Sequence, residues 1–153
     1  MSLTKKYIYQ IRFIALFAII FTTLPAHAEE QKMVVYKSPS CGCCGGWVEH
    51  LQANGFSVSV RNLEDVTPLK ERLGVPDRLQ SCHTGVIGDY LVEGHVPAAD
   101  IKRLLRENPD VHGIAVPGMP IGAPGMEMPG EPADAYASIT FNKNGPVGIF
   151  EQH

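Results

Sequence analysis

The chain has 153 residues, of which 44% are apolar, with 13 lysines and arginines against 16 aspartates and glutamates. These proportions are typical of one small globular domain and argue against a multidomain protein. The formal charge of −3 and the scattered basic residues exclude a basic patch that tracks phosphates. Nucleic acid is therefore not expected as a partner.

Residues 1–28 have the pattern of an export signal. A basic front extends to Arg12, a mostly apolar run covers 13–24, and small residues at 26–28 suit a signal peptidase. As a helix, that apolar run would cover about 18 Å, well short of a hydrocarbon core of roughly 30 Å. We therefore expect cleavage after Ala28, a periplasmic location and no stable membrane insertion of the cleaved chain.

The next segment, residues 29–110, alternates between strand and helix patterns in the order β-α-β-α-β-β-α. The predicted strands are at 33–37, 56–60, 84–88 and 90–94. The first helix runs from the cysteines to Asn54-Gly55, and the third runs from Pro97 to Asn108. The second helix has Thr67 as its N-cap and Pro68 at its first position, and it ends at Leu73-Gly74. This is the order of a thioredoxin-like α/β core. In that fold the turn before the third strand faces the cysteine motif, and here that turn contains Cys82.

Residues 111–153 are predicted to complete the same domain. Residues 111–132 contain five glycines, five prolines and three methionines with almost no charge, which predicts a loop without helix or strand. The remainder, with strands at 136–141 and 147–150, predicts a C-terminal β-hairpin. The loop is expected to wrap the domain.

The four cysteines are the main candidates for chemistry. Cys41, Cys43 and Cys44 lie within four residues at a helix start, where the helix dipole favours thiolates, and Cys82 is distant in sequence. Two structural disulfides are one interpretation, and a redox dithiol of Cys41 and Cys44 is another. Three converging thiolates also form a soft site suited to Cu(I), or less specifically to zinc. Cys43 favours the metal, because a third thiol would scramble disulfide exchange.

Histidine and methionine side chains extend this hypothesis. His83 follows Cys82, but neighbouring side chains on an extended segment point opposite ways, so its role as a ligand is left open. Met119, Met126 and Met128 lie in the loop as either apolar anchors or thioether ligands, and thioether with thiolate favours Cu(I) over zinc. Among the other histidines, His50 is expected on the solvent face of its helix and His153 is terminal, while His95 and His112 are candidates for supporting groups.

Several motifs together resemble the CopG-type periplasmic copper-resistance proteins. They are the stretches 36–44 (Tyr-Lys-Ser-Pro-Ser-Cys-Gly-Cys-Cys), 81–84 (Ser-Cys-His-Thr), 93–97 (Glu-Gly-His-Val-Pro), 117–120 (Pro-Gly-Met-Pro) and 124–127 (Pro-Gly-Met-Glu). The resemblance covers nearly all of the chain after the export signal. It implies a thioredoxin-like fold and copper binding by Cys41, Cys43, Cys44 and Cys82, with Met119 and Met126 as contributors. Ala123 and Asp89 depart from the family pattern without replacing a candidate ligand.

Three functional interpretations follow from the sequence. The first is a periplasmic protein that holds Cu(I), with bridging sulfurs and more than one ion, and interconverts Cu(I) and Cu(II) as a copper-dependent oxidoreductase. The second is a thioredoxin-type thiol-disulfide oxidoreductase, and the third is a passive copper carrier without turnover. The expected partners are copper ions, other periplasmic copper-handling proteins and an electron donor.

Overall fold

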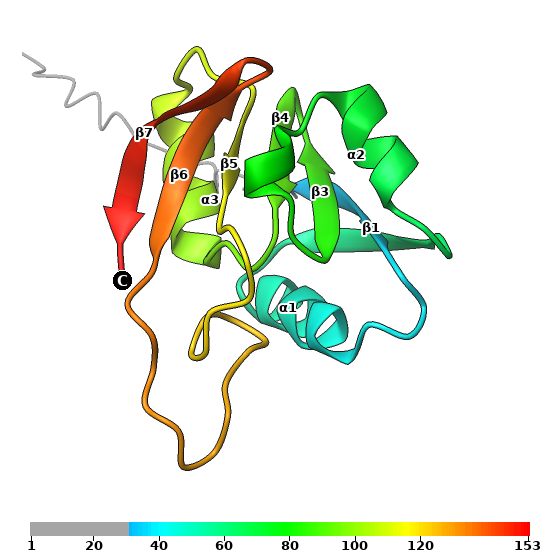
Figure 1. Ribbon diagram of the computed structural model, residues 1–153, viewed down its shortest axis with the longest axis vertical. Coiled ribbons are helices and arrows are strands. Elements are labelled where there is room, and N and C mark those ends of the chain that lie inside the picture. The colour runs from blue at the N-terminus through cyan, green and yellow to red at the C-terminus, as the bar shows by residue number, and fades with distance from the viewer. Residues whose placement is uncertain (1–30) are drawn as a thin grey trace, which may run out of the picture.

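A seven-stranded mixed sheet runs through the computed structural model, which describes residues 31–153 (Figure 1). The export signal predicted at 1–28 lies outside the described residues. The strands follow the order β2-β1-β3-β4-β5-β6-β7. Their bounds are β1 Lys32–Lys37, β2 Ser57–Asn62, β3 His83–Ile87, β4 Tyr90–Glu93, β5 Gly113–Ala115, β6 Ala137–Asn142 and β7 Gly145–Gln152.

Three α-helices connect these strands: α1 Gly42–Ala53, α2 Thr67–Leu73 and α3 Ala98–Glu107, with a short 3-10 turn, η1, at Asp77–Leu79. β1 pairs in parallel with β2 and antiparallel with β3, and β3 pairs antiparallel with β4. The chain therefore crosses from β1 to β2 through α1, and the end of β1 lies beside the start of β3. Among the described residues, no helix is both long and apolar enough to cross a membrane.

Helices cover both faces of the sheet. Trp47, Val48 and Leu51 of α1 share one core cluster with Ile101 and Leu104 of α3. A second cluster, on the side of α2 and η1, contains Val75, Leu79, Leu91, Ala115 and Phe141. Burial of these apolar side chains is the main force that fixes the helices on the sheet.

The start of α2 differs from the prediction. Thr67 is the first helical residue rather than the cap, because Val66 occupies the cap position and the Asp65 carboxylate accepts a bond from the Thr67 amide at 2.8 Å. Pro68 accordingly falls one position later than expected. The predicted end is correct: Gly74 adopts a left-handed conformation with φ of 80°.

The prediction of an unbroken loop over 111–132 is wrong at its start. Gly113–Ala115 forms β5, between β4 and β6. A side chain at Gly113 would lie 2.3 Å from the Leu91 carbonyl oxygen, so the glycine serves a close approach of two strands rather than a turn. The segment after β5 has no helix or strand until β6, which pairs antiparallel with β7.

Candidate metal centre

The register of β1 and β3 brings the two cysteine segments together. Lys37, the last residue of β1, pairs with His83, the first residue of β3. The chain leaves β1 through the turn at 38–40 into Cys41, while Cys82 is the residue just before β3. Both cysteine segments therefore lie at the same end of the neighbouring strands β1 and β3.

Three of the cysteines belong to the beginning of α1. Cys41 is the N-cap residue in an extended conformation, and its amide donates to the Ser38 carbonyl at 3.1 Å. Cys41 and Cys44 form a disulfide with their Cα atoms 5.4 Å apart. Cys43 is a free thiol whose Sγ lies 3.5 Å from Cys41 Sγ. The amides of the first helical turn have no partner within the helix and lie at the same end of α1 as these sulfurs.

Cys82 is a half-buried free thiol between two imidazoles. Its Sγ lies 3.2 Å from His83 Nδ1 and 3.2 Å from His95 Nε2. The sequence argument that Cys82 and His83 point opposite ways does not hold here, because Cys82 precedes the strand and strand alternation does not extend to it. The sequence predicts His95 only as a candidate supporting group, whereas it lies as close to this sulfur as His83.

The hydrogen bond of His95 fixes which of its nitrogens carries the proton. Its Nδ1 lies 2.9 Å from the Pro124 carbonyl oxygen, and a carbonyl only accepts hydrogen bonds. Nδ1 therefore holds the proton, and Nε2 presents its lone pair to Cys82 Sγ. This is the arrangement that orients a neutral histidine as a metal ligand.

Burial keeps both imidazoles neutral. Desolvation lowers the pKa of His83 well below its usual value, with a further contribution from His95, and desolvation also lowers the pKa of His95. Burial and the neighbouring Cys43 raise the pKa of the Cys82 thiol to about 11. Without a cation, the site therefore holds a neutral thiol between neutral imidazoles. A bound cation would favour the Cys82 thiolate.

Two overlapping ligand groups result. The Sγ atoms of Cys41, Cys43, Cys44 and Cys82 all lie within 4.8 Å of one another, and so do the ligand atoms of Cys82, His83 and His95. Cys82 belongs to both groups. His83 Nε2 is buried without a hydrogen-bond partner, and its ring packs against Trp47 with centroids 4.3 Å apart. Sulfur and imidazole donors suit a soft or borderline metal such as copper or zinc.

The glycine- and methionine-rich loop lies against this centre. The Ser81 hydroxyl donates to the Gly118 carbonyl at 2.6 Å, and Gly125 packs on the start of α1, where an added Cβ would lie 2.7 Å from the Cys43 carbonyl oxygen. Figure 1 shows this segment, in yellow and orange, beside α1. Met119 and Met128 are exposed, and Met126 is half-buried. Whether Met119 and Met126 act as ligands stays a prediction.

The remaining histidines serve other contacts. His50 is half-buried rather than on a solvent face, because its Nε2 accepts the Ala98 amide at the start of α3 at 3.1 Å. His112 Nε2 is 2.7 Å from the Leu73 carbonyl oxygen, and His153 Nε2 is 2.9 Å from Asp100 Oδ2. Burial lowers the pKa of His50.

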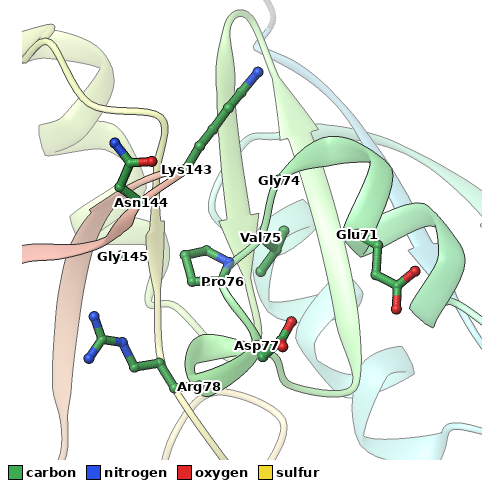
Figure 2. Close-up of a pocket in the computed structure, with 9 residues that line it drawn as sticks. All are labelled: Glu71, Gly74, Val75, Pro76, Asp77, Arg78, Lys143, Asn144 and Gly145. Carbon is green, nitrogen blue, oxygen red and sulfur yellow. The ribbon is translucent and has the colours of Figure 1, made fainter.

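A hollow of about 580 Å³ lies elsewhere, between the segment that follows α2 and the turn joining β6 to β7 (Figure 2). Its charged lining residues are Glu71, Asp77, Arg78 and Lys143. It contains neither cysteine nor histidine. The soft ligands of the described chain therefore gather at the cysteine segments and not in this hollow.

The chain is similar to one family model and to two solved structures. A family model described as "Protein of unknown function, DUF411" matches residues 79–126, which include Cys82 and His95. Two solved structures, "Copper resistance protein copG- Form 2" and "Copper resistance protein copG- Form 1", are 47% and 48% identical to this chain, each with a TM-score of 0.76. Each match covers 82% of this chain, and 99% and 98% of the respective solved chains. No curated protein matches the chain.

Proposed function

Because this chain belongs to the CopG family of copper resistance proteins, we propose that it binds Cu(I) through the sulfur atoms of its four cysteines. The observation that carries the proposal is the gathering of all four Sγ atoms within 4.8 Å of one another. Thiolates are the ligands that Cu(I) prefers in proteins. The name of the related structures refers to copper resistance, which is compatible with a role in limiting free copper.

The donor set supports more than one copper ion. Four thiolates exceed the two or three ligands that a single Cu(I) ion requires, so sulfurs that bridge neighbouring ions are the simplest arrangement. His83 and His95 add nitrogen donors on the far side of Cys82. With Nδ1 of His83 as the ligand atom, its buried and unpartnered Nε2 carries the single proton of the neutral ring. Met119 and Met126 add thioethers from the loop in this proposal.

We infer that the core is thioredoxin-like. The order β2-β1-β3-β4, with β1 and β2 parallel and β3 antiparallel to both neighbours, supports this assignment. So do the start of α1 at the cysteines and the position of Cys82 before β3. The export signal pattern at 1–28 supports a periplasmic location for the cleaved protein.

The disulfide between Cys41 and Cys44 links copper binding to redox chemistry. A disulfide cannot supply two thiolate ligands, so full Cu(I) binding requires its reduction by a separate electron donor, which supplies two electrons while the sulfurs take up two protons. In reverse, the two thiols supply two electrons and release two protons, which is sufficient to reduce two Cu(II) ions to Cu(I). We propose this exchange as the route by which the protein interconverts Cu(I) and Cu(II).

The same disulfide favours a second candidate, a thiol-disulfide oxidoreductase of thioredoxin type. Such an enzyme needs an attacking and a resolving thiol, and Cys41 and Cys44 have that spacing. It has no need for Cys43 or Cys82. Those two residues therefore discriminate between the candidates.

The discriminating experiment replaces Cys43 and Cys82 singly and together with serine. If a shared sulfur cluster holds copper, Cys43→Ser and Cys82→Ser each lower the copper stoichiometry or affinity, because a hydroxyl cannot replace a bridging thiolate. Equilibrium dialysis of the reduced, anaerobic protein against Cu(I) measures both quantities. Full copper binding by the double variant, together with strong disulfide reductase activity, would favour the second candidate.

A further inference from the structure

A buried ion pair lies next to the turn formed by Ser81 and Cys82, here called the Cys82 turn. Lys70 of α2 is 2% exposed and Glu93 of β4 is fully buried, and their side chains form a salt bridge. Desolvation of two charges is expensive, and well-packed apolar residues often replace a buried pair without loss of stability. A contribution to stability therefore does not explain why the chain has this pair. The contacts of the Glu93 carboxylate indicate a different role.

The Glu93 carboxylate holds the chain on both sides of Cys82. Its Oε1 accepts the Ser81 amide at 2.6 Å, and its Oε2 accepts the Thr84 hydroxyl at 2.5 Å. Ser81 directly precedes Cys82, and Thr84 follows two residues later. The Lys70 ammonium donates to the same carboxylate and to Thr84 Oγ1 at 2.9 Å.

The neighbouring contacts extend this arrangement to the rest of the centre. The Ser81 hydroxyl reaches the loop at Gly118, and the Gly94 amide donates to the His83 carbonyl at 3.1 Å. An added Cβ at Gly94 would lie 2.8 Å from Ser81 Cβ, so β4 and the Cys82 turn are closely packed. His95 is two residues beyond Glu93 on the same chain. Glu93 is thus connected to the segments that contribute Cys82, His83 and His95.

We propose that Lys70 and Glu93 are positioning residues that hold the Ser81-Cys82 turn, and with it the Cys82 sulfur, at a fixed place opposite the cysteines of α1. An ionised carboxylate accepts hydrogen bonds at both oxygens, which the amide and the hydroxyl require. Burial raises the pKa of Glu93, and the Lys70 ammonium beside it opposes that rise and so favours the ionised form. The expected effect on copper affinity rests on the proposed copper site. The hydrogen bonds of Glu93 that hold the turn do not depend on copper.

The first test measures Cu(I) affinity of Glu93→Gln, which keeps the side-chain volume but has only one accepting oxygen. Loss of a group that orients a ligand typically lowers metal affinity by about tenfold to a hundredfold, and we expect an effect in this range. Because both substitutions would act through one sulfur, Cys82→Ser should have a smaller effect in the Glu93→Gln protein than in the parent. Lys70→Met/Glu93→Gln, which removes both charges, replaces the single variant if that variant does not fold.

The matched control is Asp100→Asn. Asp100 is also a buried carboxylate, 4% exposed, and it accepts bonds from Ser138 Oγ at 2.6 Å and His153 Nε2 at 2.9 Å. Those partners lie outside the Cys82 turn. We expect this variant to lose stability while its Cu(I) affinity stays close to that of the parent.

The second test does not involve copper. In a protein with Cys41→Ser, Cys43→Ser and Cys44→Ser, Cys82 is the only thiol, and its rate of alkylation by iodoacetamide reports how firmly the turn is held. We expect Glu93→Gln to increase this rate and Asp100→Asn to leave it unchanged.

The outcomes separate the two proposals. If Glu93→Gln matches the parent in both tests while Cys82→Ser still loses copper, the positioning role is wrong and the copper site stands. If Cys82→Ser binds copper as the parent does, the proposed copper site fails, and the alkylation rate alone decides the role of Glu93.

Discussion

At the scale of single residues, burial determines the protonation state of the two histidines around Cys82. His83 and His95 are both buried and close to one sulfur, and burial keeps them neutral. The sequence identifies the motif that contains His95 but not the role of this residue, because a histidine that follows a strand gives no sign of where its ring points. Lys70 gave no signal either, since a lysine on a short helix is usually solvated.

His50 leads to a prediction about pH. Its Nε2 accepts the Ala98 amide, and burial lowers its folded pKa below the usual value, so the unfolded chain binds the proton first. This contribution to stability is complete above about pH 6.5 and is lost as the pH falls from there through the lowered folded pKa. His50→Gln keeps an accepting oxygen without a titrating group. We therefore expect the variant to lose less stability than the parent between neutral pH and pH 5, as urea denaturation measures it. Parallel pH profiles would contradict this role.

At the scale of elements, regular patterns were predictable and close approaches were not. The strands and helices around the cysteines follow apolar periodicity, and the order of the elements placed Cys82 opposite the α1 cysteines. β5 was missed because Gly113 signals a turn in sequence, whereas in the structure it allows two strands to approach. The loop that follows has no periodicity, so its path over α1 depends on contacts that no pattern encodes.

Gly125 tests that path. It has a φ of +82°, and an added Cβ would lie 2.5 Å from the Trp47 amide nitrogen, whereas Gly130 has a φ of +89° with nothing within 4 Å. Both alanine variants incur the left-handed backbone cost of roughly 1–2 kcal/mol. Only Gly125→Ala should also displace the loop from α1 and weaken Cu(I) binding. Equal copper affinities in the two variants would show that the loop does not contribute to the site.

The loop methionines are tested by Met119→Leu/Met126→Leu. Leucine keeps the apolar volume and removes the thioether, so each substitution should cost less than about 1.5 kcal/mol of unfolding free energy. We expect copper affinity or redox behaviour to change while the loss of unfolding free energy stays within this limit. A double variant that binds and cycles copper as the parent does would make these methionines packing residues.

At the scale of the whole molecule, the sheet joins chain segments that are far apart in sequence. α1 contributes three sulfurs, the turn before β3 contributes the fourth, β4 leads into His95, and the loop beyond β5 covers them. The cysteine spacing predicts a soft metal site, because a third thiol beside a redox pair would scramble disulfide exchange. The Cys41–Cys44 disulfide adds a redox condition that spacing alone left open.

The most direct test of the copper site is the copper X-ray absorption spectrum of the reduced protein, loaded with Cu(I) under anaerobic conditions. The gathering of four sulfurs predicts a spectrum dominated by sulfur neighbours, with a smaller nitrogen contribution from the imidazoles beside Cys82. A spectrum with only nitrogen and oxygen neighbours would contradict the proposed site.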